Sequence, residues 1–198
     1  TADYVNTICA LKEEYRGEID IHIGFEAEYL PTLFEDLLRM LEPYPYEYLL
    51  LGQHFLGDEQ GQAYTGAPTA DEEILRRYCE QSMDAMQTGV FTYFAHPDIM
   101  HFVGDEKIYR QQMGRICKAA KECNLPLEIN LLGIREGRHY PTEAFWAIAA
   151  EEGCKAVFGI DAHRPEEIAD LEPEKKALEL VEKYGLTLLE TVPLKKIN

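Results

Sequence analysis

The feature that most constrains the fold is a repeat of short apolar runs and longer amphipathic stretches along the chain. The runs recur about every 30 residues, a spacing typical of strands that alternate with helices and form a parallel sheet. The periodicity fits an open sheet as well as a closed barrel. We expect strands in the runs 18–24, 46–52, 90–95, 127–131, 156–160 and 186–189. Helical patterns lie between them, near residues 3–15, 31–42, 70–88, 105–123, 142–152 and 173–184.

Residues at the ends of the predicted helices agree with this assignment. Asp71 places negative charge at the start of one helix, where it favours the N-terminus. Gly89, Gly153 and Gly185 lie where three helices should stop, and glycine suits that place because it adopts a left-handed backbone easily. No linker, sequence repeat or low-complexity tract interrupts the pattern. We therefore expect residues 1–198 to form a single domain.

Polar side chains follow the first five apolar runs at their carboxyl ends. In α/β folds this edge of the sheet is where active sites gather. A single histidine there is usually only a hydrogen-bonding residue, but three of the six histidines and two carboxylates share the edge. Neutral imidazole and carboxylate oxygen are ligands that Zn, Mn and Fe prefer, so the pattern indicates a metal site. The residues in question are Glu26, His54, His96, Asn130, Asp161 and His163.

The chain lacks the residues that several other classes of enzyme need. A serine hydrolase would need Gly-x-Ser-x-Gly, and neither that motif nor the Gly-rich loops of nucleotide-binding proteins occur. Cys9, Cys117 and Cys123 fall in helical patterns, which favours a place in the core over a nucleophilic role. Glu26 and Glu28 lie on one face of a single strand, whereas a glycosidase usually draws its two carboxylates from separate segments.

Charge and cysteine content limit the partners and the compartment. The formal net charge is −17, from 36 acidic and 19 basic side chains. Such a surface repels nucleic-acid polymers and anionic lipids, so we expect neither as a partner. No apolar run approaches the roughly 20 residues that span a bilayer. The five cysteines are odd in number and form no Cys-x-x-Cys pair, which favours free thiols in a reducing compartment, the cytoplasm.

Four short motifs resemble those of the PHP (polymerase and histidinol phosphatase) superfamily in order and spacing. They are GFEAEY at 24–29, GQHF at 52–55, HPD at 96–98 and GIDAH at 159–163. Within the superfamily the chain looks closest to the histidinol-phosphatase branch. That closer likeness comes from LEIN at 127–130, GIR at 133–135 and YP at 140–141.

The resemblance implies a distorted (β/α)7 barrel of the TIM-like type with up to three divalent metal ions, such as Zn, Mn or Fe. It makes Glu26 a bridge between two metals, and His54 and His96 the other ligands of the second. Asp161 matches a ligand of the first metal and His163 a ligand of the third, and we expect Glu26, Asp161 and His163 to be catalytic. Their i, i+2 spacing should point Asp161 and His163 the same way if the segment is extended.

The same resemblance suggests residues for the substrate. Arg135 is similar to an arginine that contacts substrate phosphate, and Arg138 and His139 in the same loop are further candidate donors. A solvated loop is the alternative for Arg138 and His139. Asp98 should orient His96 or hold its loop.

One departure from the family concerns the start of the chain. The family opens with His-x-His on its first strand, and nothing like it is present here. His22 is the only early histidine, and we interpret it as structural within a strand. We expect that the first two β/α units are missing, that only Glu26, His54 and His96 form a complete metal position, and that the exposed edges favour a homo-oligomer or swapped dimer.

The expected activity is hydrolysis of a small phosphate ester, histidinol phosphate in histidine biosynthesis, by a metal-dependent phosphomonoesterase. Two alternatives stay open: a PHP phosphoesterase for another small ester such as a nucleotide, and a non-catalytic PHP remnant that is inactive without its first histidine motif. The sequence leaves the native metal, the ester and the oligomeric state undecided.

Overall fold

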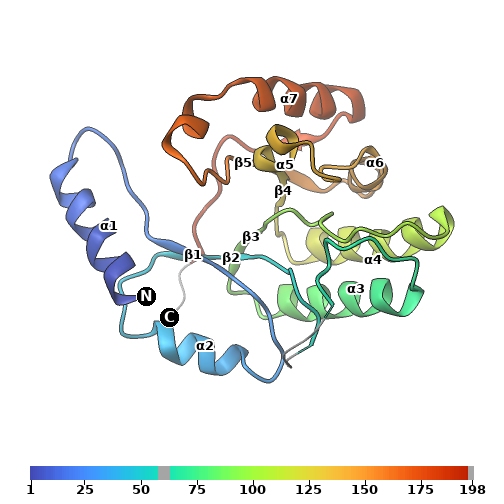
Figure 1. Ribbon diagram of the computed structural model, residues 1–198, viewed down its shortest axis with the longest axis horizontal. Helices are drawn as coiled ribbons and strands as arrows, with labels where there is room; N and C mark the ends of the chain where they lie inside the picture. The colour runs from blue at the N-terminus through green and yellow to red at the C-terminus, as the bar shows by residue number, and fades with distance from the viewer. Residues whose placement is uncertain (58–62, 196–198) are drawn as a thin grey trace.

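A single sheet of six parallel strands organises the computed structural model, which describes residues 1–57 and 63–195 (Figure 1). The strands are neighbours in chain order, from β1 to β6, and each pair runs parallel. The α/β class and the parallel order are therefore as predicted. The strands are β1 (Gly24–Ala27), β2 (Tyr48–Leu51), β3 (Phe91–Phe94), β4 (Leu127–Asn130), β5 (Lys155–Gly159) and β6 (Thr187–Leu188).

The sheet is open, so the distorted (β/α)7 barrel that the family resemblance implies is not closed within the described residues. Within the described ranges β1 pairs only with β2, and β6 pairs only with β5, so both are edge strands. Closing the sheet would need backbone hydrogen bonds between these two edges, and β6 has only two residues to offer. The molecule therefore has the parallel strands and outer helices of a barrel, but its first and last described strands do not pair.

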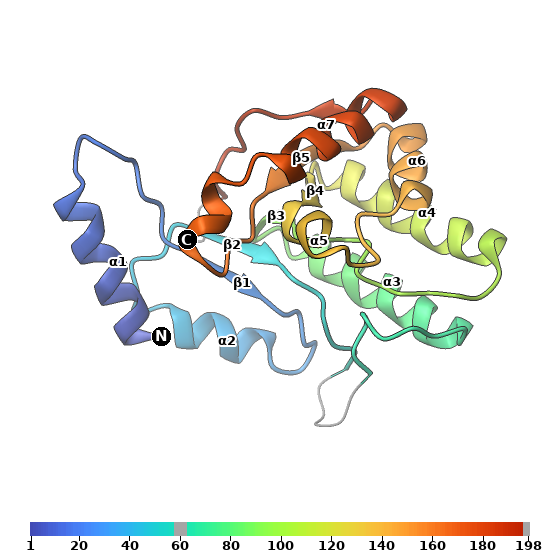
Figure 2. The same cartoon turned by 45° about the horizontal axis from the view of Figure 1, so that its top comes forward.

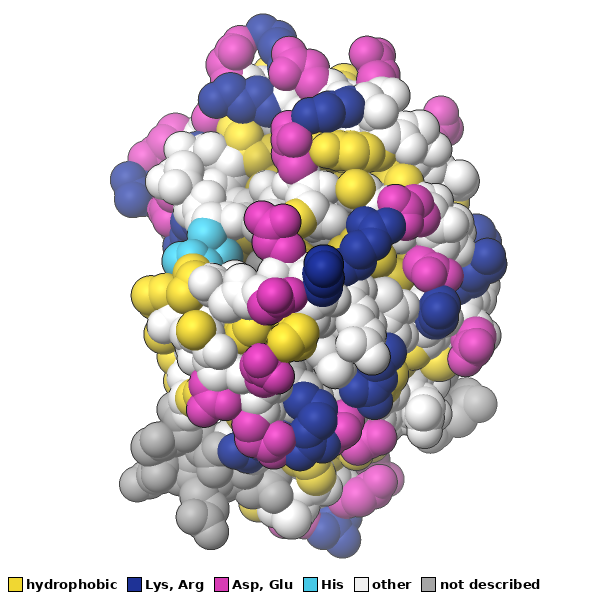
Figure 3. All heavy atoms as spheres, turned by 90° about the vertical axis from the view of Figure 1, so that its right-hand side faces the viewer, with side chains coloured by type: hydrophobic (Ala, Val, Ile, Leu, Met, Phe, Trp, Pro, Cys, Tyr) yellow, Lys and Arg dark blue, Asp and Glu magenta, His cyan; other side chains and the backbone are white. Residues whose placement is uncertain are grey.

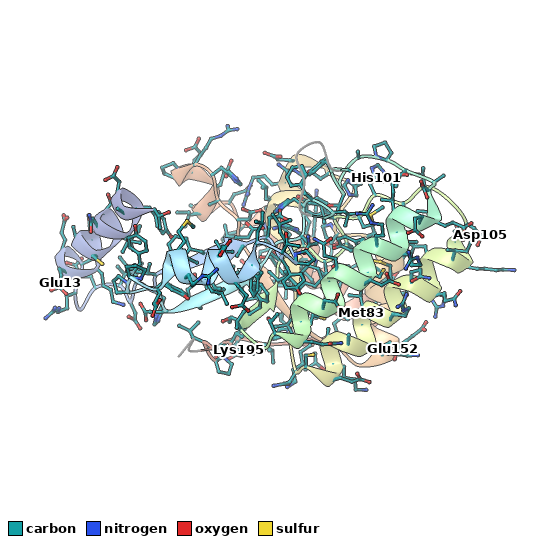
Figure 4. All side chains as sticks on the ribbon, turned by 90° about the horizontal axis from the view of Figure 1, so that it is seen from below. Glu13, Met83, His101, Asp105, Glu152 and Lys195 are labelled. Carbon is teal, nitrogen blue, oxygen red and sulfur yellow. The ribbon has the colours of Figure 1, made fainter. Side chains whose placement is uncertain are left out.

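Helices cover the sheet unevenly. In Figures 1 and 2, α3 and α4 lie side by side next to β3 and β4, α6 follows α4, and α1 projects away from the rest. Figure 4 shows Glu13 of α1 and Asp105 before α4 at opposite ends of the molecule. The helices are α1 (Ala2–Glu14), α2 (Phe34–Leu41), α3 (Glu72–Gln87), α4 (Glu106–Glu122), α5 (Leu131–Glu136), α6 (Glu143–Glu152), the 3-10 helix η1 (Pro165–Ala169) and α7 (Glu172–Tyr184).

The core lies between the sheet and the helices α3, α4 and α6. Tyr78 of α3, Phe91 of β3 and Trp146 of α6 are fully buried there. Burying a large apolar side chain contributes about 1.5–3 kcal/mol, so this part of the molecule carries most of the packing free energy. By contrast α1 buries only Val5.

The predicted helix ends agree with the caps in the structure. The side chain of Asp71 accepts a hydrogen bond from the backbone N–H of Glu73 at the start of α3. Gly153 and Gly185 end α6 and α7 in the left-handed conformation, with φ of 72° and 63°. Caps of this kind contribute about 1 kcal/mol each and fix where the following strand begins.

One predicted strand is wrong. The alternating run 18–24 precedes the strand rather than forming it, because β1 begins only at Gly24. Ile19 in this run is 58% exposed, and only Ile23 is buried, so the alternation does not mark a face packed on the core. His22 consequently lies in the connection before β1, where its Nδ1 is 2.8 Å from Glu47 Oε2.

Two short helices, α5 and η1, are not predicted by the apolar pattern. Each has too few turns for a period of 3.6 residues to appear. The side chain of Asn130 caps α5 by accepting a hydrogen bond from the backbone N–H of Gly133 at 2.8 Å. All five cysteines are free thiols, as expected. Among the described residues no helix is long and apolar enough to pass through a membrane.

Candidate metal centre at the carboxyl edge of the sheet

Three of the predicted ligands meet at the carboxyl edge of the first three strands. Glu26 lies in β1, and His54 and His96 follow β2 and β3. One potential ligand atom of each lies within 4.8 Å of the others. Glu26 Oε1 is 3.0 Å from His96 Nε2 and 3.6 Å from His54 Nε2. One carboxylate oxygen and two imidazole nitrogens are a donor set that fits a Zn, Mn or Fe ion.

Glu28 orients His54. Its carboxylate accepts a hydrogen bond from His54 Nδ1 at 2.7 Å and others from the backbone N–H groups of His54 and Phe55. With Nδ1 occupied, Nε2 of His54 is directed to the Glu26 side. Such a carboxylate-to-histidine contact commonly fixes the tautomer and the ring orientation of a metal ligand. This role of Glu28 was not predicted, because Glu28 was weighed only as half of a glycosidase pair. Its i, i+2 spacing from Glu26 is the signal that pointed to it, although Glu28 lies just after β1, which ends at Ala27.

His96 is held in an unusual backbone conformation and is almost completely buried. Its exposed fraction is 3%, and its φ is 32°, in the left-handed region that few residues other than glycine adopt. Burial disfavours the charged ring. The hydrogen bond to Glu26 and the nearby carboxylates of Glu128 and Asp161 outweigh burial and raise the pKa of His96.

Glu26 is the matching half of this electrostatic arrangement. Burial alone would raise the pKa of its carboxyl, but the hydrogen bond from His96 and the neighbouring histidines lower it. Space for the carboxylate comes from Gly52 on the next segment, where a Cβ atom would lie 2.1 Å from Glu26 Oε1. A glycine is therefore required there for Glu26 to keep its position.

Asp161 and His163 lie outside this three-residue group. Asp161 has a φ of 48°, so the segment turns and is not extended as the spacing argument assumed. The His163 ring is 66% exposed, and its Nδ1 lies 3.8 Å from Asp161 Oδ1. Asp161 is linked to the edge of the sheet through Asn130, whose amide donates to Asp161 Oδ2 at 3.1 Å. Their roles as ligands stay a prediction.

The candidate substrate residues are each tied to the surrounding protein. Arg135 is mostly buried and donates from Nη2 to the backbone oxygen of Glu167 at 3.1 Å, while its Nη1 makes no hydrogen bond. Arg138 donates to Tyr140 Oη at 2.7 Å. His139 Nε2 donates to the backbone oxygen of Ile99. Their contact with phosphate stays a prediction.

Asp98 holds a loop rather than orienting His96. Its carboxylate accepts a hydrogen bond from the backbone N–H of Thr142 at 2.5 Å, at the start of α6. The side chain is 1% exposed, and burial raises the pKa of Asp98 to about 7. Of the two roles expected for Asp98, the structure shows the contact that joins the loop after β3 to α6.

Comparison with known proteins gives a family and several similar chains. The family model "PHP domain" matches residues 1–131. A probable histidinol-phosphatase of Deinococcus radiodurans is 25% identical over 175 residues, which cover 84% of this chain and 66% of that protein. A probable histidinol-phosphatase of Schizosaccharomyces pombe is 25% identical over 186 residues, covering 84% of this chain and 61% of that protein. The chain thus spans slightly less than two thirds of these relatives.

A solved structure shares the fold. It is histidinol phosphate phosphatase from Lactococcus lactis, crystallised with zinc, L-histidinol and phosphate. The TM-score is 0.72 at 22% sequence identity, and the match covers 100% of this chain and 79% of that one. The open sheet described above therefore corresponds to most of the fold of that protein.

Proposed function

The chain belongs to the PHP domain family, and from this premise we propose that it is a metal-dependent phosphomonoesterase that hydrolyses histidinol phosphate. The observation that carries the proposal is the convergence of Glu26, His54 and His96 from three successive strands. The names of the two relatives and the molecules bound to the solved structure support the choice of ester.

In this proposal the residues of the site have separate roles in metal binding, orientation and catalysis. Glu26, His54 and His96 would hold a divalent ion, which supplies a Lewis acid that lowers the pKa of water and offsets phosphate charge. Glu28 keeps Nε2 of His54 turned to the site. Asp161 and His163, on the neighbouring segment after β5, complete the proposed catalytic group with Glu26.

Because the chain as a whole is negatively charged, basic side chains close to the site must supply the positive charge that binds the phosphate. The net charge of the chain is −17, and Figure 3 shows acidic and basic side chains interspersed over the face that it draws. Arg135 is a candidate donor because its Nη1 is buried without a hydrogen bond. Its guanidinium already lies 3.9 Å from Glu167 Oε2 and 3.4 Å from Asp170 Oδ2, so a phosphate would have to compete with these two carboxylates.

Three further properties belong to this proposal. We propose a single domain over residues 1–198, a role in histidine biosynthesis, and a cytoplasmic location. The location is supported by the free thiols of all five cysteines, which suit a reducing compartment.

The test is turnover by the purified chain after metal removal and reloading with Zn²⁺, Mn²⁺ or Fe²⁺. Histidinol phosphate should be hydrolysed faster than a mononucleotide or a sugar phosphate. Glu26→Gln should lower kcat/KM at least about 100-fold, because the amide is a poorer metal ligand than the carboxylate.

Glu179→Gln is the matched control, since Glu179 is an exposed residue of α7. Its activity should equal that of the unaltered chain. Faster hydrolysis of a mononucleotide would mean that a nucleotide, and not histidinol phosphate, is the substrate. Metal binding without any hydrolysis would favour the non-catalytic alternative. Full activity of Glu26→Gln would remove the basis of the proposal.

A further inference from the structure

Strand β4 carries two buried polar side chains next to the candidate metal centre, Glu128 and Asn130. Glu128 is 3% exposed and Asn130 is 1% exposed, in a strand whose four residues are all buried. Burying a carboxylate and an amide costs free energy unless both are hydrogen-bonded. Neither belongs to the proposed ligands, so their presence calls for another role.

Their hydrogen bonds join two of the proposed ligands. Glu128 Oε2 accepts from the backbone N–H of His96 at 2.8 Å and from Asn130 Nδ2 at 3.0 Å. The same Asn130 amide nitrogen donates to Asp161 Oδ2 at 3.1 Å. The chain of contacts therefore runs from His96 through Glu128 and Asn130 to Asp161.

The two residues at the ends of this series of hydrogen bonds, His96 and Asp161, have a strained backbone. His96 and Asp161 have φ of 32° and 48°, and Asn124 is the third such non-glycine residue among those described. A left-handed conformation at these residues costs about 1–3 kcal/mol and persists only where neighbouring contacts enforce it. Glu128 contacts His96 and Asn130 contacts Asp161, in addition to the contact between His96 Nε2 and Glu26 Oε1.

The position of Glu128 depends in turn on Gly159 of β5. A Cβ atom at Gly159 would lie 1.6 Å from Glu128 Oε1 and 2.4 Å from its carboxyl carbon, so no other residue leaves room for this carboxylate. Gly159 is thus the third member of the arrangement, and it acts by having no side chain.

We propose that Glu128 and Asn130 are positioning residues that hold His96 and Asp161 at the separation which metal binding requires. The inference rests on the proposed function for the identity of the ligands. Glu128 fixes the backbone of His96 so that Nε2 points to Glu26. Asn130 supplies the donor that keeps the Asp161 carboxylate beside the site.

Asparagine rather than aspartate is essential to this role. The amide nitrogen donates to two carboxylates at once, while a carboxylate at position 130 would offer them no donor and would add a third negative charge. Glu128, in contrast, uses a single oxygen to accept both of its hydrogen bonds, and the amide oxygen of glutamine can accept the same two.

The experiment titrates the metal-free full chain with Co²⁺ and follows its visible absorption, which reports both affinity and ligand geometry. Asn130→Asp and Gly159→Ala should each bind Co²⁺ about 10- to 100-fold more weakly, the usual effect of losing a residue that orients a metal ligand. Glu128→Gln should keep most of the Co²⁺ affinity of the unaltered chain, because the glutamine oxygen can accept the same two hydrogen bonds. Gly114→Ala in α4 is the matched glycine control, because its Cβ would meet only Ile148 Cγ2 at 3.9 Å.

A second readout needs no metal. Amide hydrogen exchange of His96 should be slow in the unaltered chain and at least about tenfold faster in Asn130→Asp and Gly159→Ala. Unchanged exchange and unchanged Co²⁺ spectra in both variants would overturn the inference. If the unaltered chain binds no Co²⁺, the proposed function fails, and the exchange rates alone then decide whether Glu128 and Asn130 hold His96.

Discussion

Two carboxylates at the edge of the sheet occupy space that a neighbouring glycine leaves open. Glu26 lies over Gly52, and Glu128 lies over Gly159. At Gly52 an added methyl group would be 2.1 Å from Glu26 Oε1 and 2.7 Å from its carboxyl carbon, so either the side chain or the backbone must move. The carboxylate is the part that can move, and it is also the proposed ligand.

Gly52→Ala should therefore weaken Zn²⁺ binding at least about tenfold and lower the free energy of unfolding by about 1–3 kcal/mol. Zinc titration calorimetry and urea unfolding measure the two effects. Gly114→Ala again serves as control and should leave both unchanged or raise stability, since alanine favours a helix. Zinc affinity equal to that of the unaltered chain would mean that Glu26 is not a ligand.

At the scale of residues, the sequence predicts which side chains meet but not how they are held. His54 and His96 could be inferred because each follows an apolar run that forms a strand, and parallel strands bring such residues to one edge. Glu26 was also inferred, although it lies within β1 and the run 18–24 before it is not a strand. The contacts of Glu28 and Glu128 could not be inferred. They depend on side-chain rotamers and on distances between strands, which a single sequence does not contain.

Among the elements, the N-terminal helix and the connection before β1 share one carboxylate as a hydrogen-bond partner. Glu47, just before β2, accepts hydrogen bonds from Lys12 Nζ at 2.6 Å, His22 Nδ1 at 2.8 Å and the backbone N–H of Ile23 at 3.2 Å. Packing of α1 involves buried Val5 and the Tyr4 ring, which lies 5.3 Å from Phe25 between centroids. Glu47 thus joins three parts of the N-terminal region to the sheet.

Protonation of Glu47 should loosen this region. Burial alone would raise its pKa, but the hydrogen bonds from Lys12 and His22 dominate and lower the pKa of Glu47 from 4.5 to about 2. Its stabilisation is therefore present above pH 4.5 and is lost as the pH falls toward 2. The hydrogen bond to Glu47 raises the pKa of His22 above 6.5, so its contribution is present below pH 6.5 and is lost at higher pH.

Glu47→Gln should accordingly destabilise the chain most between pH 4.5 and 6.5, where both groups are charged. We expect a loss of about 1 kcal/mol after allowing for solvent screening. Urea unfolding of both proteins from pH 2 to 8 gives the difference, which should shrink toward zero near pH 2. Glu14→Gln on α1 is the control, and an equal loss there would point to general charge effects.

The helices were predicted well where the amphipathic pattern continues over several turns. Helices α3, α4 and α7 show several turns of amphipathic pattern, and their predicted bounds differ from the observed ones by no more than two residues. The run 18–24 shows the opposite case, because alternation of isoleucine with polar residues also occurs in a connection whose side chains are exposed. Periodicity reports a repeating environment, and the seven residues 18–24 sample it too briefly.

For the whole molecule, the most consequential feature is the free edge at β1. Beside it, β1 and α2 enclose an apolar groove of about 470 Å³ lined by Phe25, Leu37 and others. Leu33 and Met40 at this groove are 45% and 53% exposed. An unpaired strand next to exposed apolar side chains favours pairing with another copy of the chain.

We therefore expect concentration-dependent dimers, with the β1 edge and this groove as the contact. Light scattering measures the mass over a range of concentrations. Met40→Lys should shift the midpoint to at least about tenfold higher concentration, because it places a charge in the contact. Val103→Lys, at a site 58% exposed on the loop before α4, should have no effect. A monomer at all concentrations would contradict the prediction.

The open edges of the sheet could be predicted only through the family resemblance, not from the periodic pattern. Repeated strand and helix patterns establish parallel order, yet both an open sheet and a barrel produce the same pattern. Whether edges meet depends on how the strands twist and on how many there are. Those are properties of the assembled sheet, and no single segment encodes them.

The pairing of glutamate with glycine also bears on how related chains should diverge. Glu26 is opposite Leu50 and Glu128 is opposite Val157 in the strand register, so each glycine lies two residues past the partner of its glutamate. Selection then acts on each pair jointly. Across homologous sequences, replacement of either glycine by a larger residue should coincide with a shorter side chain at the paired position, leaving two covarying pairs that mark this edge of the sheet.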